Sequence, residues 1–193
     1  MTNIEDLKKF NIHSSVLINY QTNDIENNPS MFGENLVICS NSVIYRGNLI
    51  GENCFIGHNT IIRENNHIGD NVKIGSNVEI AFNVKISDYS KIHSNVFICE
   101  NTIIDQNTFI GPNVIFLNSK IPNQKNSKKN LSSPKIGKNC IIGGGAILLP
   151  DVNIGENSFI GGGTVVTKNV PPNSIIYNIN NSLIKKNDKI FRS

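Results

Sequence analysis

Two polar side chains, Glu100 and Asn118, stand eighteen residues apart in this chain of 193 residues. Asn118 begins a polar segment, 118–134, that contains four lysines and no acidic residue. A carboxylate and an amide that lie side by side are suited to hold an amine, and lysines are suited to bind phosphate groups. These side chains form a site only if the fold brings them together.

The elements that position them follow a six-residue repeat. An apolar residue, which we call position i, recurs at every sixth residue from Phe32 to Phe116 and again from Ile136 to Val166. Position i+1 is often glycine, and position i+4 is usually small or β-branched, as in Val72. A period of six with β-branched residues favours short strands, and no helical period fits this region.

Asparagine marks the turns between these strands. Of the fourteen repeats between Phe32 and Ile115, twelve have asparagine at position i+3, and the exceptions are Gly47 and Tyr89. Asparagine and glycine are the residues that best tolerate the left-handed backbone region. We therefore expect a tight turn in every repeat.

Three repeats close a triangular coil of eighteen residues, and coils stack by parallel pairing at about 4.8 Å. Glu100 and Asn118 both occupy position i+2, so they should lie one strand spacing apart on the same wall, with Phe82 next in the column. The sequence thus predicts an all-β fold.

The repeat resembles that of the hexapeptide-repeat acyltransferases, which implies a left-handed parallel β-helix. The hand comes from the resemblance, because the general rule for parallel crossovers favours the opposite one. We expect about seven coils over residues 32–171 with one extruded loop at 118–135. An N-terminal segment, 1–31, and a C-terminal tail, 172–193, flank them.

Three segments extend the resemblance to one branch of that family. Segment 110–122, IGPNVIFLNSKIP, is similar to the GP-x-x-x-F-T-N-D-x-x-P segment of bacterial N-acetyltransferases that act on nucleotide-linked amino sugars. Segments 91–100 and 161–171 are similar to theirs as well. The resemblance implies a homotrimeric enzyme that uses acetyl-CoA to acetylate a dTDP- or UDP-linked amino-deoxysugar for surface polysaccharide or O-antigen biosynthesis.

The chemistry of amide formation assigns roles to these residues. Glu100 could orient the amine and remove a proton, and Asn118 could position the amine or donate to the oxyanion, the roles that the resemblance also implies. The coenzyme A thiolate could take the proton at the end. Phe82 and Lys120 are the expected substrate-binding residues, and a relay through the histidine that some relatives have in place of Phe82 is absent.

Coenzyme A is expected along the later coils. The triple glycines 143–145 and 161–163 leave backbone exposed on one wall, where relatives bind the pantetheine arm between subunits. The expected contact residues there are Gly144, Ala146, Gly162, Thr164 and Lys168. Structural turns would use the same glycines, and the tail departs from the G-x-P-A sequence of many relatives.

Two other functions are compatible with the sequence. An O-acetyltransferase could use His58, also at position i+2, as the base on a sugar hydroxyl. His58 precedes Asn118 by ten repeats, which is not a multiple of three, so the two should lie on different faces. A non-catalytic scaffold would need neither group, and the basic loop beside Glu100 and Asn118 argues against it.

Composition excludes several classes of protein. A net charge of +3 disfavours a nucleic-acid partner, and no apolar run reaches the roughly 20 residues of a membrane span. The polar N-terminus does not resemble a secretory signal. The four cysteines and four histidines lack metal-ligand spacing, so we expect no metal, reduced thiols and a cytoplasmic location.

Overall fold

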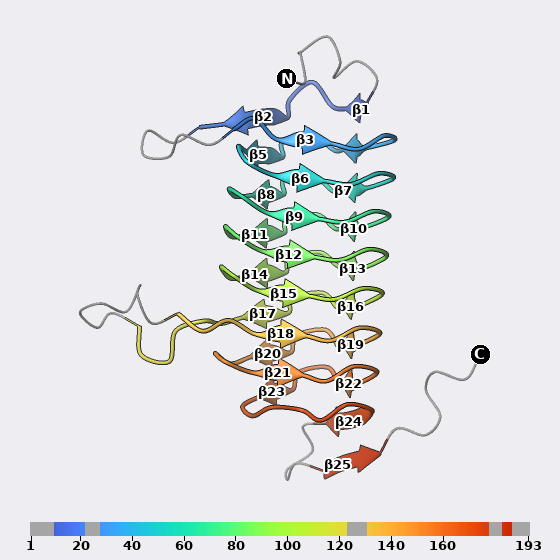
Figure 1. The fold of residues 1–193 in the computed structure, drawn as a ribbon, viewed down its shortest axis with the longest axis vertical. Coiled ribbons are helices and arrows are strands. Elements are labelled where there is room, and N and C mark those ends of the chain that lie inside the picture. The colour runs from blue at the N-terminus through green and yellow to red at the C-terminus, as the bar shows by residue number, and fades with distance from the viewer. Residues whose placement is uncertain (1–9, 22–27, 123–130, 178–182, 187–193) are drawn as a thin grey trace.

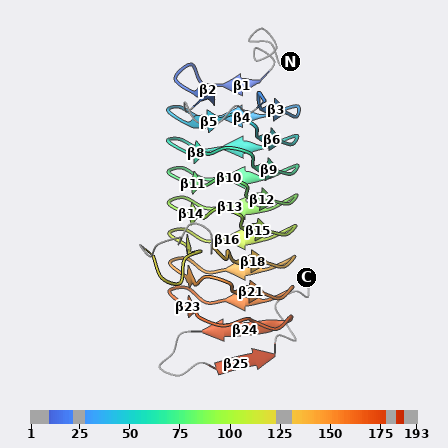
Figure 2. The same cartoon turned by 60° about the vertical axis from the view of Figure 1, so that its left-hand side comes forward.

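The computed structural model describes residues 10–21, 28–122, 131–177 and 183–186. In these residues the chain forms 25 short strands and no helix. Successive strands run around a triangular coil. From β1 to β23, each strand pairs in parallel with the strand three further along the chain, which gives three sheets. Figures 1 and 2 show the coils stacked in one column.

We name the sheets A, B and C after the order in which the chain visits them. Sheet A contains β1 (Asn11–Ile12), β4 (Val37–Ile38), β7 (Phe55–Ile56), β10 (Lys73–Ile74), β13 (Lys91–Ile92), β16 (Phe109–Ile110), β19 (Ile141–Ile142), β22 (Phe159–Ile160), β24 (Ser174–Tyr177) and β25 (Leu183–Lys186). Sheet B contains β2 (Leu17–Tyr20), β5 (Val43–Tyr45), β8 (Ile61–Ile62), β11 (Glu79–Ile80), β14 (Phe97–Ile98), β17 (Ile115–Phe116), β20 (Ile147–Leu148) and β23 (Val165–Val166). Sheet C contains β3 (Met31–Phe32), β6 (Leu49–Ile50), β9 (His67–Ile68), β12 (Lys85–Ile86), β15 (Ile103–Ile104), β18 (Lys135–Ile136) and β21 (Asn153–Ile154).

The pairing register confirms the eighteen-residue coil. Ile62 pairs with Ile80 and Ile80 with Ile98, each eighteen residues along the chain. Across the extruded loop the spacing becomes 32, as between Ile104 and Ile136. The loop therefore adds 32 − 18 = 14 residues to a single connection, the one between β17 and β18, and no coil is lost.

The turns also form as predicted. Asparagines at position i+3 have φ near 60°, in the left-handed region, from Asn35 to Asn113. The two exceptions in the repeat adopt the same conformation, with φ of 79° at Gly47 and 59° at Tyr89. The i+3 position thus specifies a backbone shape, and asparagine is common there because it tolerates that shape.

The core is the inside of the triangular coil. Residues at position i are buried from Ile38 to Val166, for example Ile98 and Phe116, which are fully buried. Residues at position i+4, such as Val72 and Val96, fill the space behind them. The pattern of apolar residues therefore becomes one continuous core.

The coils begin earlier than predicted. Residues 10–21, in the predicted N-terminal segment, contribute β1 and β2 to sheets A and B, so the column has about eight coils where we expected seven. Ile12 and Ile18 keep the six-residue spacing, but the next position i, Phe32, comes fourteen residues later. That long connection conceals the first coil in the sequence. At the other end, β24 pairs with β22, and β25 pairs antiparallel with β24.

Candidate active site

The turn between sheets B and C, which we call the B–C corner, carries the predicted column of side chains. Arg46, Glu64, Phe82, Glu100 and Asn118 occupy this corner in five successive coils. Backbone hydrogen bonds tie neighbouring levels together, because the amide after Phe82 donates to the carbonyl of Glu64 and the amide after Glu100 to that of Phe82. The eighteen-residue stacking predicted from the repeat is therefore present at the corner itself.

Glu100 and Asn118 touch. The Nδ2 atom of Asn118 donates to Oε2 of Glu100 at 2.5 Å, and both residues are half-buried. A carboxylate can only accept, so this contact fixes the orientation of the Asn118 amide and leaves its Oδ1 atom as an acceptor. A carboxylate oxygen and an amide oxygen then lie together, an arrangement that suits an amine with its several N–H donors.

The base of the extruded loop is fastened around this pair. The hydroxyl of Ser133 donates to the backbone carbonyl of Glu100, and the Ser132 amide donates to the carbonyl of Asn118 at 2.9 Å. Ser132 also donates through Oγ to Asp151 at 2.9 Å. These contacts hold the two ends of the loop, at Asn118 and at Ser132 and Ser133, against the corner.

Lys120 also lies at the base of the loop, and its side chain faces Asp151. Its Nζ atom is 3.3 Å from Oδ2 of Asp151, and both side chains are exposed. The hydrogen bond from Ser132 and the charge of Lys120 hold the pKa of Asp151 below its usual value. The other three lysines of the predicted loop, Lys125, Lys128 and Lys129, lie outside the described residues.

The comparisons with known proteins can be set beside this geometry. The family model described as "bacterial transferase hexapeptide (six repeats)" matches residues 49–82 and 133–168. The two matched segments together cover 70 of the 193 residues. The match confirms the predicted hexapeptide-repeat acyltransferase family and the prediction that the chain is an enzyme. Comparison of the sequence with curated proteins found no match.

Three solved acyltransferase structures are similar to this chain. UDP-N-acetylglucosamine acyltransferase from Campylobacter jejuni is 18% identical with a TM-score of 0.55, over 90% of this chain and 73% of that one. A hexapeptide-repeat acetyltransferase from Vibrio cholerae is 20% identical with a TM-score of 0.49, over 67% and 71%. Soybean serine acetyltransferase is 25% identical with a TM-score of 0.40, over 59% of this chain and 40% of its own. At these identities the likeness concerns the fold alone.

His58 of the transferase lies at another corner, between sheets A and B, as predicted. Its Nδ1 atom is 2.8 Å from Oγ of Ser40, and its backbone amide donates to Oγ of Ser76 at 3.1 Å. This A–B corner is separated from the B–C corner by the width of sheet B, and His58 belongs to a coil three levels from that of Asn118. One subunit therefore does not bring His58 to Glu100 and Asn118.

The five residues predicted to bind coenzyme A divide into three groups. Gly144 and Gly162 lie at the A–B corner, and Lys168 lies at the B–C corner. The side chains of Ala146 and Thr164 are buried inside the coil, at most 2% exposed, so only their backbone could contact a ligand. The structure thus separates the predicted donor site between two corners of one chain.

The triple glycines do leave an open wall at the A–B corner. Gly145 and Gly163 take the left-handed turn, with φ of 70° and 68°. A Cβ atom at Gly163 would have nothing within 4 Å, and one at Gly145 would reach only backbone at 3.9 Å. A narrow ligand arm could therefore lie directly against this backbone.

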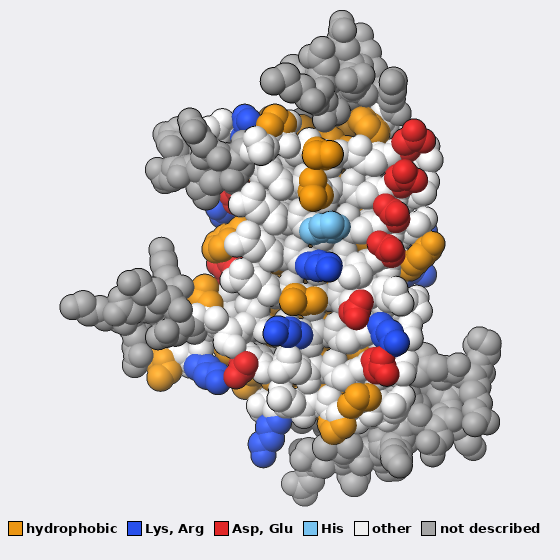
Figure 3. Space-filling model, viewed as in Figure 1, with side chains coloured by type: hydrophobic (Ala, Val, Ile, Leu, Met, Phe, Trp, Pro, Cys, Tyr) orange, Lys and Arg blue, Asp and Glu red, His pale blue; other side chains and the backbone are white. Residues whose placement is uncertain are grey.

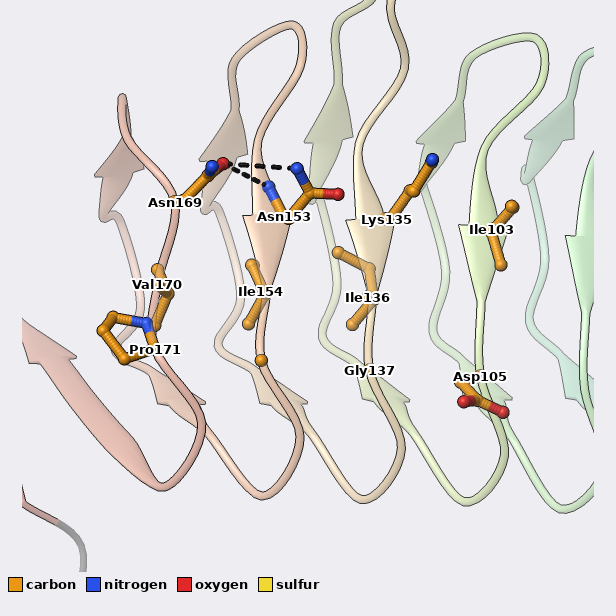
Figure 4. A pocket seen from close by; sticks show the side chains of 11 residues that line it. Ile103, Asp105, Lys135, Ile136, Gly137, Asn153, Ile154, Asn169, Val170 and Pro171 are labelled. Atoms are coloured by element: carbon orange, nitrogen blue, oxygen red, sulfur yellow. Dashed lines mark hydrogen bonds between the residues drawn. The ribbon is translucent and has the colours of Figure 1, made fainter.

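A cavity lies elsewhere, on the outer surface of sheet C. It has a volume of about 470 Å³ and is lined by Ile103, Lys135, Asn153 and Asn169 among others (Figure 4). Asn169 accepts hydrogen bonds from the backbone and side chain of Asn153 at 2.9 and 3.4 Å. Neither Glu100 nor Asn118 lines this cavity, so the paired groups, and not the hollow, define the candidate active site.

Sequence reasoning missed Ser132, Ser133 and Asp151. Serines in a polar loop carry no spacing signal, so the two hydroxyl contacts could not be predicted. Asp151 did carry one, because it stands at the i+3 position where the repeat has asparagine and has φ of 70°. An acid in that place, one coil beyond a lysine-bearing loop, indicates a partner for one of the lysines.

Metal and membrane signals are lacking in the described residues. No group of three or more His, Cys, Asp or Glu side chains there could hold a metal ion. No helix in the same part of the chain has the length and apolar character needed to cross a membrane.

Proposed function

We propose that this enzyme transfers an acetyl group from acetyl-CoA to the amino group of a dTDP- or UDP-linked amino-deoxysugar in surface polysaccharide or O-antigen biosynthesis. The contact between Glu100 and Asn118 carries the proposal, because a carboxylate beside an amide oxygen suits an amine better than a hydroxyl. We assign Phe82, one coil from Glu100 at the same corner, and Lys120, at the base of the loop, to the rest of the acceptor pocket.

In the proposed reaction the sugar amine attacks the thioester carbon of acetyl-CoA, and the coenzyme A thiolate leaves. Glu100 accepts a proton from the bound ammonium. Oδ1 of Asn118 accepts a hydrogen bond from an N–H of the amine, which aims the nitrogen lone pair at the thioester carbon. The N–C bond forms, the C–S bond breaks, and the departing thiolate takes up the second proton that leaves the nitrogen. Glu100 releases the first proton to water. The products are the N-acetyl sugar and coenzyme A.

The donor side of the proposed site needs a second subunit. Gly144 and Gly162 lie at the A–B corner, whereas Glu100 and Asn118 lie at the B–C corner of the same chain. If three copies face a common axis with sheet B, the A–B corner of each subunit stands opposite the B–C corner of the next. The glycine wall would then lie across from Asn118, at levels one and two coils away, about 4.8 and 9.6 Å along the axis.

The outer surface of sheet B fits such a contact. From β1 to β24 the outward residues of sheets A and C each include two lysines, and Figure 3 views the outer surface of sheet C. The outward residues of sheet B are apolar with one exception, Glu79. The outward residues of sheet B are Leu17, Val43, Ile61, Glu79, Phe97, Ile115, Ile147 and Val165. We therefore assign sheet B to the interior of the proposed homotrimer.

A matched pair of variants tests the trimer. Ile115 on sheet B and Ile103 on sheet C are both 39% exposed, so either substitution by aspartate disturbs the fold to a similar extent. Light scattering should give a trimer mass for Ile103→Asp and a smaller mass for Ile115→Asp, with acetyl transfer lost only in the second. Equal masses for the two variants would contradict the assignment of sheet B.

Activity is tested by incubating the enzyme with acetyl-CoA and a panel of nucleotide-linked amino sugars and following thiol release. We expect release with at least one amino sugar and none with the matching hydroxy sugar. Glu100→Gln keeps the size of the side chain but removes the base, so it should lose most of kcat. Normal turnover by this variant would refute the role of Glu100.

The alternative, an O-acetyltransferase, draws support from one observation. The hydrogen bond between Ser40 and Nδ1 of His58 fixes the ring and leaves Nε2 as the remaining nitrogen for a sugar hydroxyl. This mechanism predicts an ester product and a dead His58→Ala enzyme. The N-acetyltransferase proposal predicts an amide product and chemistry that does not depend on His58.

We place the reaction in the cytoplasm. The four cysteines, Cys39, Cys54, Cys99 and Cys140, are all free, which suits a reducing compartment. The proposed partners are the nucleotide sugar and acetyl-CoA, with no nucleic acid, no membrane insertion and no metal.

A further inference from the structure

The B–C corner continues beyond Glu100 toward the N-terminus with a set of side chains that the acetyl transfer does not use. Phe82 lies one coil from Glu100, Arg63 and Glu64 lie two coils away, and Tyr45 lies three coils away. Tyr20 ends the column at the first coil. The connections that follow β2 and β17 both leave from this corner.

Arg63 is held in one pose by a buried carboxylate. Glu64 occupies an outward position yet is only 3% exposed, and its oxygens accept from Nε and Nη2 of Arg63 at 2.9 and 3.4 Å. The Arg63 guanidinium lies 4.8 Å from the centre of the Tyr45 ring. Its Nη1 atom has no hydrogen-bond partner among the described residues, and the side chain is 37% exposed. The pair therefore presents a preorganised donor to solvent.

Buried amides brace these two levels from inside the coil. Asn48 and Asn66 occupy position i+4, which is usually small or β-branched, and they are at most 1% exposed. Asn48 donates to the carbonyl of Tyr45 at 2.8 Å, and Asn66 to that of Arg63 at 2.9 Å. Amides thus replace core side chains directly behind Tyr45 and Arg63, which keeps the corner rigid.

The end of the column is aromatic. The rings of Tyr20 and Tyr45 meet edge to face, with centres 5.2 Å apart and planes at 75°. Tyr20 is 46% exposed, so one face of this pair is available to a planar ligand. Tyrosine faces of this kind stack on nucleobases.

The order of these groups follows the order of parts in a nucleotide-linked sugar. Each coil advances by about 4.8 Å, so the column runs over roughly 19 Å from Glu100 to Tyr20. Along it lie an amine-binding pair, an apolar ring at Phe82, a guanidinium at Arg63 and an aromatic pair. An amino sugar, a diphosphate and a base present the complementary groups in the same sequence.

We propose that this column binds the nucleoside diphosphate part of the acceptor. Arg63 donates to the diphosphate, the exposed ring of Tyr20 stacks on the base while Tyr45 supports that ring edge to face, and Phe82 packs against the sugar. The proposal rests on the proposed function, since it extends the same site from the amine to the nucleotide. Coenzyme A also contains a nucleoside diphosphate, so the test must separate the two sources.

Calorimetry with UDP and dTDP alone, and with 3′-phospho-ADP for the donor, provides that test. We expect a pyrimidine diphosphate to bind and Glu100→Gln to leave its affinity unchanged. The double variant Arg63→Gln, Glu64→Gln avoids an unpaired buried charge and should weaken binding about tenfold or more. Tyr20→Ala, at an exposed ring, should weaken it roughly tenfold. Lys91→Gln, on the outer surface of sheet A, serves as the control with unchanged affinity.

Three results would overturn the proposal. They are no binding of either pyrimidine diphosphate, equal affinities for the wild type and both variants, or loss of 3′-phospho-ADP binding in the same variants. Thiol release separates this outcome from a failure of the proposed function. If only the subsite is wrong, a nucleotide-linked amino sugar still releases thiol, and the Arg63/Glu64 and Tyr20 variants release it as fast as the wild type. If only the function is wrong, UDP or dTDP binding still responds to the variants although no amino sugar releases thiol.

Discussion

Asn118→Ala tests the geometry of the candidate site most sharply. The substitution removes the donor that touches Glu100 at 2.5 Å and also the acceptor Oδ1 that we assign to the amine. The backbone of Asn118 stays in place, because its carbonyl still accepts from Ser132. The fold and the mass of the particle should therefore be unchanged.

The size of the effect follows from the contact that is lost. A hydrogen bond to a charged group is worth about 1.5–3 kcal/mol, which corresponds to roughly 10- to 150-fold in kcat/KM if it is formed fully in the transition state. Initial rates of thiol release at varied sugar concentration would measure it. Because the amide orients the amine, the loss should be mainly in kcat.

The matched control is Gln106→Ala, which removes an exposed amide at the same i+2 position of another corner. It should leave kcat/KM unchanged. If Asn118→Ala stays within twofold of the wild type while its mass and thermal stability are unaltered, the Glu100–Asn118 pair does not hold the amine and the reasoning fails.

Three further predictions concern stability and reactivity. Tyr89→Asn should raise the melting temperature, because Tyr89 is 60% exposed and its φ of 59° costs a side chain other than glycine or asparagine about 1 kcal/mol; a lower melting temperature would contradict the turn argument. The Asp151 carboxyl has a pKa lowered from its ordinary value of 3.8. Its stabilisation of the loop is therefore fully present above pH 3.8 and is lost as the pH falls through its pKa in the folded protein. Limited proteolysis of the loop should therefore accelerate in acid, and Asp151→Asn should show the fast rate at neutral pH as well. Burial raises the pKa of Cys140 to about 11, so this thiol should resist alkylation at pH 8 in the native protein and react only after unfolding.

The fold could be predicted almost entirely from the sequence because one period governs it. The core positions and the left-handed turns follow from the six-residue repeat and its asparagines. The adjacency of Glu100 and Asn118 follows from stacking residues eighteen apart. The first coil was missed, since the connection from Ile18 to Phe32 breaks the period before the long repeat begins. Local irregularity, and not a different architecture, concealed it.

The site could be predicted less completely, for a physical reason. Periodicity fixes which residues share a corner, but it does not fix which side chains turn toward one another. Lys120 pairs with Asp151 across the loop base, and Arg63 turns onto Tyr45, through contacts that depend on side-chain reach. Gly144 and Lys168, assigned together from the sequence, lie at different corners because they follow different sheets.

The central claim is that the Glu100–Asn118 corner forms an amide on a nucleotide-linked amino sugar. The most direct test is mass spectrometry of the sugar product after reaction with acetyl-CoA, together with hydroxylamine treatment, which cleaves esters and spares amides. The account predicts an acetylated product that resists hydroxylamine and forms in the wild type but not in Glu100→Gln. A hydroxylamine-sensitive product, or equal product from both enzymes, would contradict it.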